Sequence, residues 1–98
     1  MKIKIIEAYR NIVAIADKEL IGKQFEEGKK ILNVKESFYD GELLETNELK
    51  EILQIQKKED ATFNIVGKKA IDLALEENII HKDSVGEIAG IPYAIILL

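Results

Sequence analysis

The sequence predicts an α+β fold, a two-layer sandwich in which a largely antiparallel sheet carries two helices on one face. Short segments with alternating or β-branched residues recur along the chain and indicate strands. Two longer segments repeat apolar residues with helical spacing. Because strands and helices do not alternate strictly, a fully parallel sheet is not expected. Residues 1–98 are expected to form a single domain, since a chain of this length supports one core.

The first two strands are expected to form a β-hairpin. Isoleucine and lysine alternate within Lys2–Tyr9, which is typical of a half-buried strand. A turn at Arg10–Asn11 then leads into the apolar segment Ile12–Asp17. Asp17 is expected to cap a short helical turn, which Gly22 ends.

The middle of the chain predicts a strand and then a helix. Lys29–Val34 is expected to form a strand bracketed by Gly28 and by a loop at Ser37–Gly41, where Asp40–Gly41 signals a turn. Asn47 is a good N-cap for a helix that ends at Lys57 or Lys58. Three apolar residues share one stripe of this helix: Leu49, Ile52 and Leu53.

The last third predicts a strand, a second helix and two further strands. Thr62–Val66 is β-branched and aromatic, and Lys68–Asn78 is amphipathic, with Asn78 suited to the left-handed position that ends a helix. A polar loop then precedes strands at Val85–Ile88 and Ile91–Leu98. Pro92 lacks an N–H group and therefore marks a strand start or an edge.

Composition excludes several classes of protein. The net charge is −4 and is even along the chain, with eight basic and ten acidic side chains in residues 1–49 and six and eight in residues 50–98. The absence of cysteine excludes disulfides and thiolate chemistry. No apolar segment is long enough for a membrane span or a signal peptide, so a cytoplasmic location without membrane contact is expected. Abundant lysine and glutamate suit a thermophile or an AT-rich genome equally.

Gly67, Lys68 and Lys69 raise the sharpest chemical question. A glycine turn before a helix can offer free N–H groups to a phosphate, and two lysines would add to that attraction. The alternative is a glycine-permitted turn with solvated lysines. The second interpretation is favoured because a single glycine is a weak motif. The segment also lacks the second glycine and the hydroxyl residue after the lysine that a nucleotide-binding loop has.

A second basic segment contains Lys23, Phe25, Lys29 and Lys30. An aromatic ring beside lysines suits single-stranded nucleic acid, because the ring stacks on a base while the ammonium meets a phosphate. The alternative places Phe25 in the core and uses the lysines to protect a strand edge. This alternative is favoured, since two glutamates lie between the lysines. In the adjacent aromatic pair Phe38–Tyr39, one ring is expected in the core.

Catalytic and metal-binding patterns are weak. His81 has no histidine or cysteine partner for a metal, and Asp83 is near it only in sequence. Ser37 and Ser84 lack the context of a serine nucleophile. No catalytic residue, metal site or cofactor is therefore expected. An enzyme is disfavoured.

Four segments together resemble an uncharacterised archaeal family, domain of unknown function 424: ADKELIGKQFEEG, FYDGE, NIVGKKAIDLALEENII and GEIAGIPYA. The resemblance implies a single small α+β domain, and it carries an association with translation and RNA. The matching positions are Gly22, Lys23, Phe25, Gly28, Phe38, Tyr39, Gly41, Asn64, Gly67, Pro92 and Ala94. This chain departs from the family pattern at Glu26, where the family has arginine, and at Tyr93, where it has histidine.

Three hypotheses for function follow. The first is a non-catalytic module that binds RNA or a ribonucleoprotein through Lys23, Phe25, Lys29, Lys30, Tyr39, Asn64, Gly67, Lys68, Lys69 and Tyr93. The second is a protein-interaction or homo-oligomeric module that uses the apolar C-terminal segment from Ile91 to Leu98. The third, least favoured, is a small enzyme that uses Tyr93 or His81 beside an anion-binding turn at Gly67.

Overall fold

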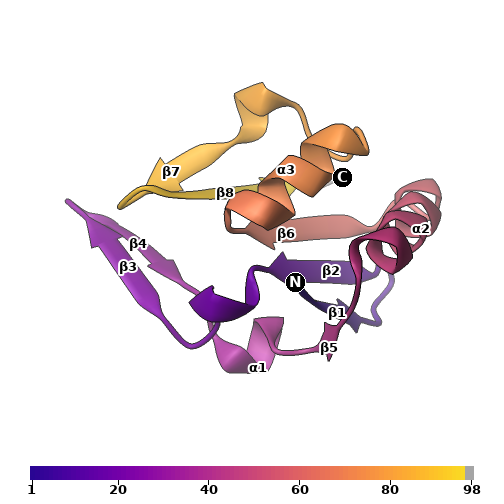
Figure 1. Cartoon of the computed structure of the whole chain (residues 1–98), viewed down its shortest axis with the longest axis horizontal. Helices are drawn as coiled ribbons and strands as arrows, with labels where there is room; N and C mark the ends of the chain where they lie inside the picture. Colours follow the sequence, from indigo (N-terminus) through magenta and orange to yellow (C-terminus); the bar gives the residue numbers. More distant parts are fainter. Residues whose placement is uncertain (97–98) are drawn as a thin grey trace.

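The computed structural model describes residues 1–96 and contains one large sheet with the strand order β5-β1-β2-β6-β8-β7 (Figure 1). Its strands are β1 (Lys2–Ile6), β2 (Ile12–Ala16), β5 (Glu42–Leu43), β6 (Thr62–Val66), β7 (Gly86–Ile88) and β8 (Ile91–Ile96). A separate hairpin consists of β3 (Gln24–Glu27) and β4 (Lys30–Asn33). The helices are α1 (Glu36–Tyr39), α2 (Thr46–Lys58) and α3 (Lys68–Glu76), with short 3₁₀ turns η1 (Lys18–Leu20) and η2 (Lys82–Ser84).

The large sheet is antiparallel except at its centre. There β2 runs parallel to β6, with Ala14 opposite Asn64 and Ala16 opposite Val66. All other neighbouring strands in this sheet pair antiparallel. The predicted largely antiparallel sheet is therefore confirmed, and the predicted β1–β2 hairpin is present. The parallel pair was not predicted, because sequence periodicity shows which residues form strands but not which distant strands pair.

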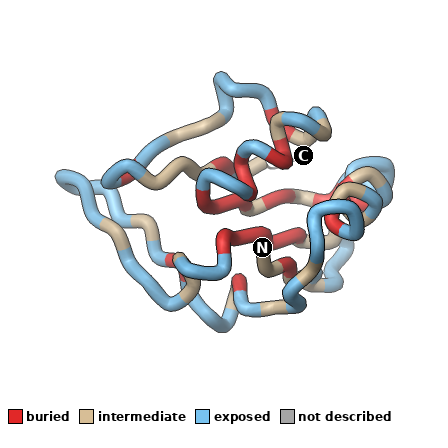
Figure 2. The backbone as a smooth tube through the Cα atoms, viewed as in Figure 1, coloured by how far each residue is buried: buried red, intermediate tan, exposed pale blue. Residues whose placement is uncertain are grey.

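Helices α2 and α3 cover the same face of the sheet, as predicted. Every second residue of the central strands points to them, which follows from the period of two in a strand. The core between the layers is formed by Ile3, Val13, Ile15, Phe63, Ile65 and Ala94 of the sheet, Leu49 and Leu53 of α2, and Ala70, Ile71, Leu73 and Ala74 of α3. In Figure 2 the buried residues gather mainly along β2, β6 and α3.

The opposite face of the sheet is covered only at one end, by α1 and the β3–β4 hairpin. A second apolar cluster lies there. Its buried members are Ala14, Ala16, Val34, Tyr39 and Val66, and half-buried side chains including Phe25, Leu32, Phe38, Ile91 and Tyr93 surround them. The molecule therefore has a third, partial layer that the two-layer prediction did not include.

Several element boundaries differ from the predictions. The loop expected at Ser37–Gly41 is largely the one-turn helix α1, and the strand expected at Lys29–Val34 is β4, paired with the unpredicted strand β3. Asn47 is not the N-cap of α2, because the helix begins at Thr46. Its cap position is Glu45, whose N–H donates to Glu48 Oε1 at 3.4 Å.

The remaining helix and strand predictions agree with the structure, apart from small shifts at the ends. Helix α2 ends at Lys58, β6 has the predicted bounds and α3 begins at Lys68. Asn78 has φ 57°, the left-handed conformation expected of a residue that follows a helix. Leu97 and Leu98 of the predicted last strand lie outside the described residues. Within residues 1–96, no helix has both the length and the apolar character that a membrane crossing requires.

Candidate functional site: the lysine end of the sheet

The candidate site is built where the two parallel strands end together. Ala16 and Val66 are the last residues of β2 and β6 and lie in register. Asp17 follows the first strand, and Gly67 follows the second. The Asp17 N–H donates to the Val66 carbonyl oxygen at 3.1 Å, which holds the two chain segments together beyond the sheet. In many proteins with parallel strands, ligands bind outside these carboxyl ends.

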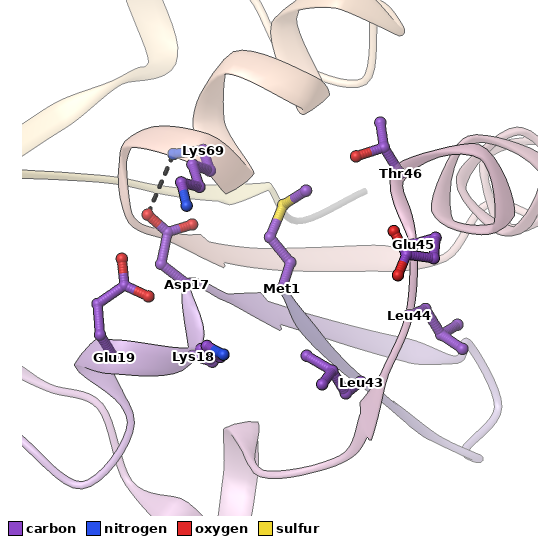
Figure 3. Close-up of a pocket in the computed structure, with 9 residues that line it drawn as sticks. All are labelled: Met1, Asp17, Lys18, Glu19, Leu43, Leu44, Glu45, Thr46 and Lys69. Atoms are coloured by element: carbon purple, nitrogen blue, oxygen red, sulfur yellow. Dashed lines mark hydrogen bonds between the residues drawn. The ribbon is translucent and has the colours of Figure 1, made fainter.

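Asp17 caps helix α3 from the end of β2. Its Oδ1 accepts the Ala70 N–H at 2.9 Å and its Oδ2 accepts the Lys69 N–H at 3.1 Å, a contact drawn in Figure 3. The Asp17 residue is only 4% exposed. Asp17 is the N-cap residue of η1, as predicted, and its carbonyl oxygen accepts the Leu20 N–H at 3.0 Å, but its carboxylate makes no capping bond to that turn. It binds the longer helix instead, whose N-terminal N–H groups would otherwise be buried without partners.

Gly67 lets Asp17 come this close. Its φ is +108°, and a Cβ atom built there would overlap Asp17 Cγ and lie 2.6 Å from Asp17 Oδ2. The Gly67 N–H donates to the Pro92 carbonyl oxygen at 2.9 Å. The N–H groups of Lys69 and Ala70, which a phosphate would have used at this turn, are therefore bound to a carboxylate of the protein itself.

Six exposed lysines lie in the segments at this end of the sheet, with α3 on one face and the β3–β4 hairpin on the other, and we call this set the lysine end: Lys18, Lys23, Lys29, Lys30, Lys68 and Lys69. They come from three separate parts of the chain, namely the segment after β2, the β3–β4 hairpin and the first turn of α3. Lys68 forms an ion pair with Asp72 at 3.2 Å. The other five have no carboxylate within 4.0 Å among residues 1–96.

A contact between two hairpin tips fixes the position of the turn that carries Lys29 and Lys30. The Ala89 N–H in the β7–β8 turn donates to Glu27 Oε1 at 2.8 Å. Ala89 has φ 51°, an uncommon conformation for a residue with a side chain. Figure 1 shows the β3–β4 hairpin as an arm whose tip lies beside this turn. The contact holds the tip against the large sheet and occupies the carboxylate nearest to the two lysines in sequence.

The aromatic residues that were predicted to contact RNA lie in or against the second cluster. Tyr39 is buried, and burial raises the pKa of its phenol above 10.0. Phe38 packs edge-on against Tyr39 with ring centroids 5.0 Å apart, so the expectation that one ring of this pair lies in the core is confirmed. Phe25 and Tyr93 are half-buried in the same cluster. Asn64 is half-buried on β6, in register with Ala14 and Ile95, and is not brought to the lysine end.

A polar pocket of about 330 Å³ adjoins the lysine end (Figure 3). It lies between η1, the start of α3 and the segment that leads into α2, and its lining includes Asp17, Lys18, Glu19, Glu45 and Lys69. Sequence reasoning did not find this pocket, because its charged residues are separated by up to 52 positions. Their closeness in space depends on the unpredicted parallel pair.

The residues considered for catalysis are not gathered in this pocket. Neither Tyr93 nor His81 lines it. His81 is exposed next to η2, at the far end of α3 from Gly67. Within residues 1–96, no group of three His, Asp or Glu side chains is placed to hold a metal ion.

The fold and its lysine end define a small mixed α+β protein built on a six-stranded sheet. The chain belongs to the family described as protein of unknown function DUF424, whose model matches residues 6–98, and the resemblance seen in the sequence is thereby confirmed. Its structure is similar to the crystal structure of an uncharacterised conserved protein from Methanopyrus kandleri, with a TM-score of 0.82 and 20% sequence identity. The similarity covers 97% of this chain and 88% of that chain and shows a shared fold. No curated protein matches the sequence.

Proposed function

We propose that the protein is a non-catalytic, cytoplasmic binding module that contacts RNA or a ribonucleoprotein through the lysine end. The observation that carries this proposal is that exposed lysines from three chain segments lie at the end of the sheet where β2 and β6 finish, on the first turn of α3, after β2 and on the hairpin held against the β7–β8 turn. Lysine ammonium groups provide the phosphate attraction on which nucleic-acid affinity largely depends.

The pairing of local charges supports the proposal despite the net charge of −4. Three acidic side chains at this end already have partners in the protein: Asp17 binds N–H groups of α3, Glu27 binds the Ala89 N–H and Asp72 binds Lys68. Five lysines have no such partner among residues 1–96. Because bonds to neutral N–H groups leave Asp17 and Glu27 charged, the attraction to phosphates is expected to come from individual exposed lysines and not from a net positive charge at this end.

Fluorescence anisotropy with a labelled RNA of mixed sequence tests the proposal. The wild type is expected to bind with an affinity that falls as salt rises, because bound lysines release counterions from the RNA. The double substitution Lys29→Glu/Lys30→Glu should weaken binding by about tenfold or more, since it replaces two attractions with two repulsions. Both residues are exposed, so the fold should be retained.

The matched control is Lys58→Glu/Lys82→Glu, which changes the net charge equally. Lys58 ends α2 near the start of β6, and Lys82 lies in η2, so both are away from the carboxyl ends of β2 and β6. This variant should bind almost as well as the wild type. Equal losses in the two variants would mean that total charge, and not the lysine end, governs binding. Absence of salt-sensitive binding by the wild type would refute the proposal.

A protein-interaction module is the second candidate, and the pairing of β8 favours it. Strand β7 pairs with β8 only from Ile91 to Tyr93, so the edge of β8 beyond Tyr93 has no strand partner among residues 1–96. Ile95 is 56% exposed beside this edge. If the chain forms a homo-oligomer here, light scattering should show a mass that rises with concentration, and Ile95→Lys should abolish the rise. A monomer at high concentration would remove the homo-oligomeric form of this candidate.

A further inference from the structure

We infer that the RNA bound at the lysine end is double-helical and is held by its phosphates without base stacking. This inference rests on the proposed function and specifies its ligand.

The lysine end lacks the aromatic platform that single-stranded binding usually employs. Proteins that bind single strands stack successive bases on exposed rings. Here Tyr39 and Phe63 are buried, and Phe25, Phe38 and Tyr93 pack into or against the second cluster. The sixth aromatic residue, Tyr9, has a fully exposed side chain. It lies in the β1–β2 turn, at the end of the sheet opposite the lysine end.

Four of these lysines lie in two pairs on separate elements of the fold. Lys29 and Lys30 lie at the tip of the β3–β4 hairpin, which the 2.8 Å bond between Glu27 and Ala89 holds in place. Lys68 and Lys69 lie on the first turn of α3, whose start is fixed by Asp17. Two held sets of cations suit a duplex, because it offers two phosphate strands on either side of a groove.

The phosphate density of RNA also favours a duplex as the ligand. A duplex concentrates phosphates more than a single strand does, and its binding releases more counterions per contact. Where stacking contributes nothing, the form with the denser charge binds more tightly. Contacts to phosphates carry no direct sequence information, so affinity should not depend on the base sequence.

Competition between two kinds of RNA with equal numbers of phosphates tests the inference. We would measure anisotropy with a blunt duplex RNA, a second duplex of shuffled sequence and an unstructured uridine oligonucleotide. Both duplexes should bind equally well and about tenfold or more tighter than the single strand. Tyr9→Ala should leave all three affinities unchanged, and Lys29→Glu/Lys30→Glu should weaken binding to both duplexes.

The possible failures are distinguishable. A single strand that binds as tightly as the duplexes, or a loss of affinity in Tyr9→Ala, would overturn the inference and leave the proposed function standing. A strong difference between the two duplex sequences would also overturn it. If neither form of RNA binds in a salt-sensitive way, the proposed function itself fails.

Discussion

The carboxylate of Asp17 and the N–H of Ala70, 53 positions apart in the chain, are joined by a hydrogen bond of 2.9 Å. This bond, with its companion to the Lys69 N–H, ties the end of β2 to the start of α3. It also fills the position that an anion would take at this helix N-terminus. Any attraction of phosphates to this end must therefore come from lysine side chains and not from the helix N–H groups.

Replacement of Asp17 is expected to destabilise the fold strongly. Asp17→Ala leaves the buried N–H of Ala70 and the part-buried N–H of Lys69 without partners, and the free energy of unfolding should fall by about 2–4 kcal/mol. Urea denaturation followed by circular dichroism measures this. Glu19→Ala changes an exposed neighbouring carboxylate and should cost less than about 0.5 kcal/mol. Similar losses in the two variants would show that the bonds to α3 contribute little.

Gly67→Ala should be destabilising for two separable reasons. The φ of +108° strains any side chain, and the added methyl would overlap the Asp17 carboxylate. We expect a loss of about 3 kcal/mol or more. Gly28→Ala is the matched control: it also has a positive φ, but no atom lies within 4 Å of the added methyl, so it should cost only about 1 kcal/mol.

A double-mutant cycle separates these two reasons. The loss from Gly67→Ala should be smaller in the Asp17→Ala background, because the carboxylate that the methyl overlaps has gone. We expect a coupling of about 1 kcal/mol or more between the two positions. Additive losses would contradict the close approach of Asp17 to Gly67 that the structure shows.

Ala89→Asn should stabilise the protein. Ala89 adopts φ 51° in the two-residue β7–β8 turn, where asparagine is strongly preferred. The backbone N–H that binds Glu27 is retained in the variant. The free energy of unfolding should rise by about 0.5–1 kcal/mol, measured as a higher denaturant midpoint with an unchanged slope. A neutral or lower midpoint would indicate that this turn is not strained.

Tyr39 should contribute a loss of stability in alkaline solution. Burial raises the pKa of its phenol above 10.0, so the unfolded chain ionises first as the pH rises. Its contribution is complete below pH 10.0 and is lost as the pH rises through the folded pKa. Above pH 10.0, wild type should therefore lose stability relative to Tyr39→Phe, whereas Tyr9→Phe, at an exposed ring, should follow the wild type. Parallel profiles for wild type and Tyr39→Phe would contradict this account.

The elements that the sequence predicted are those with strong local signals. Alternation in Lys2–Ile6 and the apolar stripes of α2 and α3 reflect burial on one face, and burial leaves a period in the sequence. Strand β3 was missed because QFEE offers a single apolar residue, Phe25, to the second cluster. The capping position at Glu45 was missed because asparagine is the more usual cap.

The candidate site was only partly predictable. Gly67 and the lysines other than Lys18 were identified from sequence, because a glycine before a helix and lysines clustered near glycines are local patterns. The partner of that turn, Asp17, was assigned to the helical turn beside it in sequence. Its real contacts lie 52 and 53 positions away and arise from the parallel pairing of β2 and β6, which no local pattern specifies.

The salt dependence of duplex RNA binding tests the central claim most directly. We would compare the slope of log Kobs against log salt concentration for wild type, Lys29→Ala/Lys30→Ala and the control Lys58→Ala/Lys82→Ala. If Lys29 and Lys30 contact phosphates, the first variant should reduce the magnitude of the slope by about 2 and the control should leave it unchanged. An unchanged slope in Lys29→Ala/Lys30→Ala, or an equal reduction in the control, would contradict the assignment of RNA binding to the lysine end.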